Sequence, residues 1–235
     1  MTQTQQVVNC MKMLGGAATF GQLNLNMDFS QWRTKTPDAS IRRIVQTSDY
    51  FFKIQPGLWA LTEYRDEILK RLGFKMGDPQ SEHKFTHAYY QGLILEIGNL
   101  RNKQTFVPNQ DKNKAFMGRA LGEVSSLIEI HKFTHEDIVK FARTVDAIWF
   151  NERKMPCDFF EIEHTTDMKN SLLKFLELQD FNSNFFIIAP GYKRNKFDQE
   201  ISRSSFKQIQ GRVRFVEYED LAKLHTQEYA KLRCI

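Results

Sequence analysis

Two stretches decide the fold of the second half of the chain: Val145-Asp-Ala-Ile-Trp-Phe150 and Asp158-Phe-Phe-Glu-Ile-Glu-His-Thr165. Both are short and rich in apolar and aromatic residues, which predicts two strands joined by a turn. Because side chains alternate along a strand, Phe159, Glu161 and Glu163 share one face. Two carboxylates at i and i+2 lie about 7 Å apart and repel each other, and acids are disfavoured in strands. A compensating cation is therefore expected at this face.

Asp146 lies in the neighbouring predicted strand and could converge on the same face. Three carboxylates, water and a backbone carbonyl form the hard oxygen site that suits Mg²⁺ or Mn²⁺. Such a site polarises a phosphate and activates water for hydrolysis. The alternative interpretation is an edge strand with solvated acids that pair with Lys or Arg.

The surrounding pattern predicts an α/β domain with a central sheet flanked by helices. The apolar strand 184–189 implies burial on both sheet faces, because its side chains offer no polar side to water. The predicted elements are helices over 82–99, 121–130 and from 134, strands over 145–150 and 158–165, a helix over 167–181, a strand over 184–189, a helix over 197–210, a strand over 213–216 and a helix over 218–232.

The run Asp146-Ala-Ile-Trp, followed by Phe160-Glu-Ile-Glu-His164, a long helix and a buried strand, resembles the PD-(D/E)xK nuclease core. The resemblance covers roughly residues 85–220 and implies a restriction-endonuclease-like mixed sheet. It implies that Asp146 and Glu161 bind Mg²⁺ or Mn²⁺ together with the backbone carbonyl of Ile162.

Glu163 occupies the position at which this family usually has a Lys that orients the attacking water. Some restriction endonucleases of the fold use Glu at this position, so the resemblance still implies a catalytic role for Glu163. Others recruit Lys or Gln from the next helix, where this chain offers Lys169, Lys174 and Gln179.

The family commonly adds an acid from an early helix, and the candidates are Glu96 and Glu123. Glu96 is preferred because its predicted helix is the more amphipathic. Asp158 competes with Asp146 as the first acid, but it faces away from Glu161 in the strand.

The N-terminal pattern predicts three helices followed by a β-hairpin, the order of a winged helix-turn-helix. In its third helix Thr36 is expected at the N-cap and Pro37 at the first position. The run TPDASIRRIVQTSDYFFKIQPGLWAL, residues 36–61, resembles the HARE-HTH type of winged helix. This resemblance covers about the first 70 residues and implies DNA binding, and bacterial members of the family are often fused to nuclease domains.

A third helix in this order presents exposed side chains to the DNA major groove. Arginine and lysine contact guanine or phosphate there. The alternative is a solvated basic face in a protein-interaction module. The DNA-binding candidates are Lys35, Ser40, Arg42, Arg43 and Lys53.

Composition narrows the remaining classes of protein. The chain has 235 residues and a net charge of +5, a modest lean toward a polyanionic partner. No apolar run approaches the length of a membrane span, and neither a secretory signal nor a metal-binding cysteine motif is evident. We expect a cytoplasmic protein. Without a GxxxxGK motif, we expect no nucleotide cofactor.

The sequence therefore predicts a winged-helix DNA-binding domain over 1–72, a linker over 73–81 and a nuclease-like domain over 82–235. The expected function is a restriction-type endonuclease that hydrolyses double-stranded DNA with Mg²⁺ or Mn²⁺. Double-strand cutting with one site per chain favours a homodimer. The alternative is a non-catalytic DNA-binding or regulatory protein that uses a degenerate nuclease fold as a dimerisation scaffold.

Overall fold

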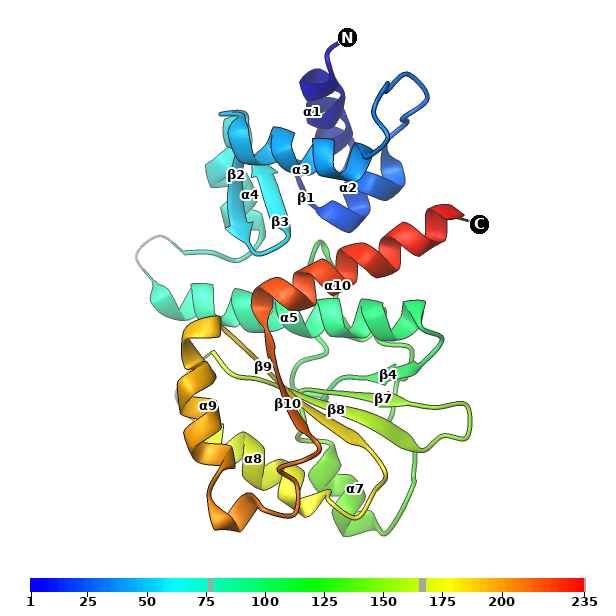
Figure 1. Ribbon diagram of the computed structural model, residues 1–235, viewed down its shortest axis with the longest axis vertical. Helices are drawn as coiled ribbons and strands as arrows, with labels where there is room; N and C mark the ends of the chain where they lie inside the picture. Colours follow the sequence, from blue (N-terminus) through cyan, green and yellow to red (C-terminus); the bar gives the residue numbers. More distant parts are fainter. Residues whose placement is uncertain (76–77, 165–167, 235) are drawn as a thin grey trace. The chain divides into compact units, whose positions relative to one another are not determined.

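The computed structural model describes residues 1–75, 78–164 and 168–234. Parts of the predicted linker over 73–81, of the predicted strand over 158–165 and of the predicted helix over 167–181 lie outside the described residues, at 76–77 and 165–167. The chain divides into two compact units (Figure 1), Met1–Glu82 with Ala222–Ile235, and His83–Leu221. The sequence pattern instead predicts that residues 222–235 belong to the second domain.

The first unit contains helices and a three-stranded antiparallel sheet with strand order β1-β3-β2. Its elements are α1 (Gln3–Met13), β1 (Ala17–Thr19), α2 (Phe20–Asn26), α3 (Pro37–Thr47), β2 (Phe51–Gln55), β3 (Leu58–Leu61), the 3-10 turn η1 (Thr62–Tyr64) and α4 (Arg65–Arg71). The predicted third helix and hairpin are present as α3, β2 and β3, whereas β1 is an element that the sequence pattern did not indicate.

Local signals explain where these helices begin and end. The hydroxyl of Thr2 accepts a hydrogen bond from the backbone N–H of Gln5 at the start of α1. Gly15 and Gly16 follow α1 with φ of 82° and 86°, a left-handed conformation that glycine adopts without strain and that ends the helix. Pro37 stands at the first position of α3 as predicted, but the side chain of Thr36 makes no capping hydrogen bond.

The second unit is built around a mixed sheet. Its elements are α5 (Pro79–Leu100, which begins in the first unit), β4 (Gln104–Phe106), β5 (Ala115–Phe116), β6 (Arg119–Ala120), α6 (Leu121–Val124), α7 (Glu136–Ala142), β7 (Ala147–Phe150), β8 (Pro156–Ile162), α8 (Met168–Glu177), β9 (Asn184–Ala189), the 3-10 turn η2 (Gly191–Lys193), α9 (Arg194–Ile201), the 3-10 turn η3 (Ser204–Phe206), β10 (Val213–Glu217) and α10 (Tyr218–Lys231), which continues into the first unit and is followed by η4 (Leu232–Cys234).

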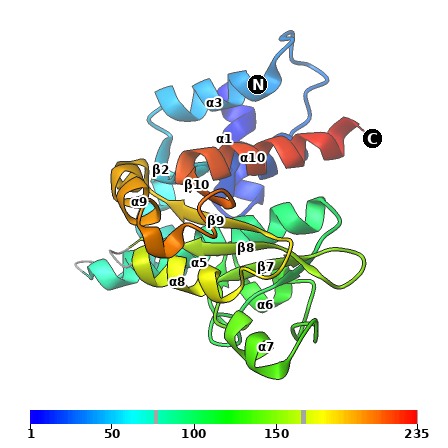
Figure 2. The ribbon, with the colours of Figure 1, turned by 60° about the horizontal axis from the view of Figure 1, so that its bottom comes forward.

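The five-stranded sheet has the order β10-β9-β8-β7-β4, and Figure 2 shows β10, β9, β8 and β7 side by side. Strands β8, β9 and β10 are parallel, and β7 is antiparallel to both β8 and β4. The predicted mixed sheet flanked by helices is therefore confirmed. The three parallel strands end at one edge of the sheet, which is where ligands bind in sheets of this kind.

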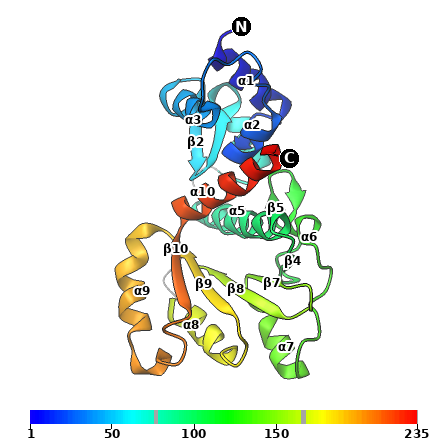
Figure 3. The ribbon, with the colours of Figure 1, turned by 45° about the vertical axis from the view of Figure 1, so that its right-hand side comes forward.

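Helices cover both faces of the sheet, with α5 on one face and α7, α8 and α9 on the other (Figures 1 and 3). Phe159 and Phe185 stack within the sheet, and Phe175 of α8 packs on Phe185. On the opposite face Trp149 donates its indole N–H to the carbonyl of Ile94 in α5 at 3.2 Å. Glu161 lies on the same sheet face as Phe159, so its side chain points toward α8.

Two predicted helices are wrong in extent. The helix predicted over 121–130 is only the four-residue α6, because Ser125 and Leu127 bind the carbonyl of Thr105 and draw the chain toward β4. The helix predicted over 197–210 is α9, which begins earlier and ends at Ile201. Within the described parts of the chain, no helix combines the length and the apolar character needed to cross a membrane.

Candidate active site

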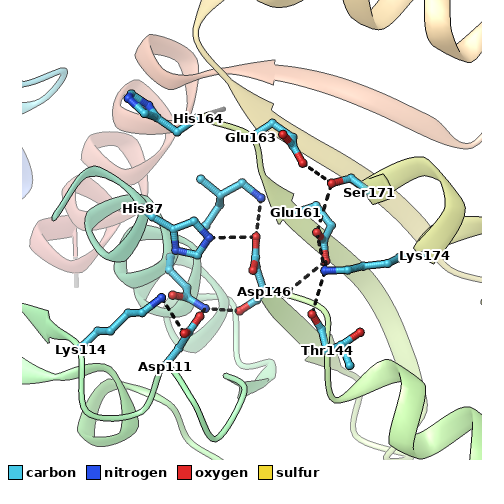
Figure 4. Close-up of polar contacts among 12 residues, drawn as sticks. His87, Asp111, Lys114, Thr144, Asp146, Glu161, Glu163, His164, Ser171 and Lys174 are labelled. Carbon is cyan, nitrogen blue, oxygen red and sulfur yellow. Dashed lines mark hydrogen bonds and ion pairs between the residues drawn. The ribbon is translucent and has the colours of Figure 1, made fainter. Parts of the chain in front are cut away.

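Asp146 stands immediately before β7, and both its side chain and its backbone are held in place (Figure 4). Its Oδ2 accepts a hydrogen bond from the backbone N–H of Ile162 in β8 at 2.7 Å. Its own backbone N–H donates to Glu161 Oε1 at 3.3 Å, and its carbonyl accepts from the side-chain amide of Gln91. These contacts hold two carboxylates from adjacent strands next to each other.

Glu161 is 3% exposed and is enclosed by residues of α8. Lys174 Nζ lies 2.9 Å from Glu161 Oε1 and 2.9 Å from Oε2, and it donates a third hydrogen bond to the carbonyl of Thr144, also at 2.9 Å. Ser171 donates to Glu161 Oε2 at 3.2 Å. Lys174 and Ser171 are three residues apart, so one helix face presents both to the carboxylate.

Glu163 follows the end of β8 and is 8% exposed. Its backbone N–H donates to the carbonyl of Ile188 at 2.8 Å, which extends the pairing of β8 with β9 by one residue. The hydroxyl of Ser171 also binds Glu163 Oε1. A hydroxyl carries one proton, so Glu161 and Glu163 share a single donor at Ser171.

His87 of α5 also contacts the Asp146 carboxylate. Its Nε2 lies 3.2 Å from Asp146 Oδ2. Burial tends to lower the pKa of His87, but the charge of Asp146 and the hydrogen bond to it outweigh burial and raise the pKa. In return, His87 and the Ile162 N–H hold the pKa of Asp146 below its usual value despite its burial.

The pKa of Glu161 is raised well above its usual value, first because the carboxyl is buried and second because Asp146 is negative. Lys174 opposes both effects, and the pKa of Lys174 is itself raised, because its attraction to Glu161 outweighs the effect of burial. Asp146 therefore keeps its negative charge, and that charge together with burial opposes the ionisation of Glu161.

A second polar group supports the site from the loop after β4. Gln91 of α5 donates to Asp111 Oδ2 at 2.9 Å, and Lys114 pairs with Asp111 Oδ1 at 2.6 Å (Figure 4). Sequence reasoning did not identify His87, Gln91 or Asp111. Only the packing of α5 on the sheet brings them to Asp146, and no local motif signals this.

The structure brings together Asp146, Glu161, Ile162 and Glu163, with Lys174 as the cation from the next helix. Lys169 is exposed on α8, and Gln179 lies beyond the end of α8, where Arg212 binds its backbone carbonyl.

The predicted early-helix acid lies away from the carboxylate pair. Glu96 is buried against Arg119 at 2.7 Å. It lies about 13 Å along α5 from His87, so α5 meets Asp146 through His87. Glu123 accepts from the backbone N–H of Ala120 as part of a helix cap, and Asp158 binds Asn184 at 2.9 Å.

In the first unit, the DNA-binding candidates lie on and beside α3. Arg42 and Arg43 are exposed on α3, and Arg42 lies over the ring of Phe20 at 5.3 Å. Lys35 is exposed before the helix and Lys53 is exposed on β2, whereas Ser40 is half-buried and binds the carbonyl of Thr36.

The donor atoms at the carboxylate pair fit a hard divalent cation. Within residues 1–75, 78–164 and 168–234, no group of three or more His, Cys, Asp or Glu side chains is arranged to hold a metal ion. Mg²⁺ is commonly bound by one or two carboxylates, with water and substrate phosphate as its other ligands. Half-buried Asp146 and buried Glu161 supply two carboxylates, which meets this requirement without a third acidic side chain.

The family model for the C-terminal domain of the type II restriction enzyme NmeDI matches residues 72–235, so the chain belongs to this family. The type II restriction enzyme NmeDI of Neisseria meningitidis serogroup C is 23% identical over 153 residues. The match covers 61% of this chain and 43% of that enzyme, so it spans less than half of the length of the relative. No solved structure matches the chain.

Proposed function

We propose that this chain is a restriction-type endonuclease that hydrolyses phosphodiester bonds of double-stranded DNA. The observation that carries the proposal is the carboxylate pair of Asp146, which is half-buried, and Glu161, which is buried; the hydrogen bond from Ile162 to Asp146 holds the two side by side. Membership in the family of a type II restriction enzyme C-terminal domain supports DNA as the substrate. The second unit would be a PD-(D/E)xK nuclease domain.

Asp146 and Glu161 would hold Mg²⁺ or Mn²⁺, with the carbonyl of Ile162 as a third protein ligand. Because the N–H and carbonyl of one residue leave an extended strand on the same side, the Ile162 carbonyl faces the side on which its N–H binds Asp146. The bound cation would polarise the scissile phosphate and lower the pKa of a bound water.

The other side chains have distinct roles in this proposal. Lys174 favours the ionised form of Glu161, because its positive charge opposes the effects of burial and of Asp146, which raise the Glu161 pKa. A carboxylate oxygen of Glu163 accepts the proton of the attacking water, and Ser171 fixes the position of that carboxylate. Glu163 is an acceptor only while it is ionised, so this role requires it to be deprotonated.

The first unit would act as a winged helix that binds DNA. Its α3 exposes Arg42 and Arg43, and β2 exposes Lys53, which would place cations on a recognition helix and a wing. Cutting both strands of a duplex with one site per chain calls for two chains, so a homodimer is part of the proposal. Light scattering of the chain bound to duplex DNA tests this assembly.

A cleavage assay tests the proposed activity. Unmodified and methylated plasmid DNA is incubated with the full chain in Mg²⁺, Mn²⁺ or chelator, beside Asp146→Asn and Glu161→Gln. Glu177→Gln, an exposed acid at the end of α8, is the matched control. We expect metal-dependent discrete fragments from the wild type and the control, and a loss of at least about a hundredfold in each site variant.

No fragments from any substrate, with DNA still retained in a gel shift, would instead support a DNA-binding protein with a degenerate nuclease domain. Full cleavage by Glu161→Gln would contradict the site assignment.

A further inference from the structure

Lys193 is a buried lysine whose ammonium group has no acceptor within the described part of the chain. It ends the turn η2, which leaves the carboxyl end of β9 and leads into α9. Its side chain is 6% exposed, and its Nζ has no hydrogen-bond partner among the residues that the structure describes. An ammonium group has three N–H donors, and burying them unpaired is strongly unfavourable. A buried lysine in this state indicates a position at which an acceptor arrives from outside the chain.

The turn around Lys193 is fixed by its neighbours. A Cβ at Gly191 would lie 2.8 Å from Glu217 Oε2, so a larger residue at this position would displace the Glu217 carboxylate. Arg194 pairs with Glu217 at 3.3 Å and lies 4.6 Å from the centroid of the Phe215 ring. The guanidinium of Arg194 is therefore engaged, whereas the neighbouring Lys193 ammonium has no hydrogen-bond partner among the described residues.

Lys193 lies at the same edge of the sheet as the candidate catalytic carboxylates. Strands β8 and β9 are parallel, with Ile162 paired to Ile188, and the Glu163 N–H binds the Ile188 carbonyl. The segments that follow β8 and β9, which carry Glu163 and η2, therefore leave the sheet at the same end. Burial lowers the pKa of Lys193, and the charge of Glu163 opposes this effect, so the two side chains influence each other electrostatically.

Lys174, the lysine that contacts Glu161, has no free N–H donors. Lys174 spends its three N–H donors on the two oxygens of Glu161 and on the carbonyl of Thr144. It would have to break one of these bonds to reach a water or a phosphate. Lys193 can donate without giving up a described contact.

We propose that Lys193 is a phosphate-binding residue, whose ammonium group donates to a non-bridging oxygen of a DNA backbone phosphate at the shared carboxyl edge of β8 and β9. The assignment rests on the proposed function, because that function supplies the DNA. Phosphate oxygens are charged acceptors, so they satisfy the Lys193 donors for which the described residues offer no acceptor, and lysine binds them as a point charge. Lys174 is then a positioning residue for Glu161, and Lys193 is the lysine that contacts substrate.

The salt dependence of DNA binding tests this assignment. Binding of a short labelled duplex of mixed sequence is measured by fluorescence anisotropy at several salt concentrations, with chelator present so that no cleavage occurs. The full chain is compared with Lys193→Met and with Lys207→Met, an exposed lysine that precedes β10 at the other end of the sheet. We expect Lys193→Met to bind about tenfold more weakly. The slope of log K against log salt should fall by about 0.9, the value for one lost phosphate contact. Lys207→Met should match the wild type.

Thermal unfolding separates this role from a structural one. If Lys193 served to neutralise Glu163, Lys193→Met would leave that buried carboxylate uncompensated and lower the Tm. We expect a Tm equal to or above that of the wild type in phosphate-free buffer, because methionine replaces an unpaired buried charge. Inorganic phosphate should raise the Tm of the wild type and not that of Lys193→Met. Lys193→Arg keeps the charge and should retain most of the salt slope.

An unchanged affinity and slope in Lys193→Met would overturn the assignment, and so would a Lys193→Met chain that fails to fold. If the wild type binds and cleaves DNA while Lys193→Met does so equally well, only the role of Lys193 fails. If the wild type neither binds nor cleaves any DNA, the proposed function fails with it.

Discussion

The carboxylate of Asp146 accepts a 2.7 Å hydrogen bond from the backbone N–H of Ile162. This bond joins the residue before β7 to the last residue of β8. The position of the Asp146 side chain therefore depends on β8, the strand that carries Glu161. Glu161 returns the contact by accepting the backbone N–H of Asp146. The two carboxylates are therefore positioned by the sheet, and α8 and α5 supply the cations beside them.

Removing Lys174 should change the pH dependence of activity. Lys174 lowers the pKa of Glu161 against the effects of burial and of Asp146, so in Lys174→Met the Glu161 pKa should rise further. The acid limb of the cleavage rate against pH should then move to higher pH. Breaking this largely buried pair should also cost about 3 kcal/mol of stability near pH 8. Lys169→Met, exposed on the same helix, is the control and should leave both measurements unchanged. An unmoved acid limb in Lys174→Met would contradict the role given to Lys174.

The stability of the metal-free protein should fall as pH rises through the pKa of Glu161. The pKa of Glu161 is raised in the folded chain, so Glu161 contributes stability that is fully present below its unfolded pKa of about 4.3. That stability is lost as pH rises through the folded pKa. With chelator present, the difference in stability between Glu161→Gln and the wild type should therefore shift in favour of the variant as the pH is raised from about 5 to about 8. Urea unfolding across this range measures the difference, and parallel curves for the two proteins would argue against the raised pKa.

The charge of Asp146 should control the titration of His87. The pKa of His87 is raised because Asp146 outweighs the effect of burial, and Asp146→Asn leaves only the smaller effect of the Asp111 charge to oppose burial. We therefore expect the His87 pKa to fall below its ordinary value in Asp146→Asn. NMR titration of the histidine ring protons measures it, and His135, outside this contact, serves as an internal reference. A His87 pKa that is unchanged in the variant would show that the pair does not form in solution.

The basic face of α3 should contribute to DNA affinity independently of cleavage. Replacing Arg42 and Arg43 together by Gln should weaken binding in chelator. It should also reduce the salt slope by up to about 1.8, which corresponds to two phosphate contacts. Lys70→Gln removes an exposed cation from α4 and is the matched control. Equal slopes for the double variant and the control would favour a protein-interaction role for the first unit.

The sequence predicted the elements whose pattern is local and strong. The apolar run of β9, the Pro37 start of α3 and the alternation along β8 each identify one element. The alternation also placed Glu161 and Glu163 on one face, where both now contact Ser171. The predicted helix over 121–130 failed because its later residues bind β4, a long-range contact that outweighs helical spacing.

The remainder of the site depends on packing that no local pattern records. The next helix offered three polar candidates, and only the rotation of α8 over the sheet selects Lys174. His87 is 59 positions before Asp146 in the chain and reaches it because α5 covers the opposite face of the sheet. The spacing of Lys174 from Ser171 is a signal that sequence reasoning could use, because residues three apart share a helix face.

Calorimetric titration with Mn²⁺ tests the central claim most directly, because it measures the proposed metal site without requiring the recognition sequence. The full chain is titrated beside Glu161→Gln and the control Glu177→Gln. The carboxylate pair predicts that the wild type and Glu177→Gln bind Mn²⁺ alike and that Glu161→Gln loses this binding. Equal Mn²⁺ binding by Glu161→Gln and the wild type would contradict the assignment of the metal site to Asp146 and Glu161.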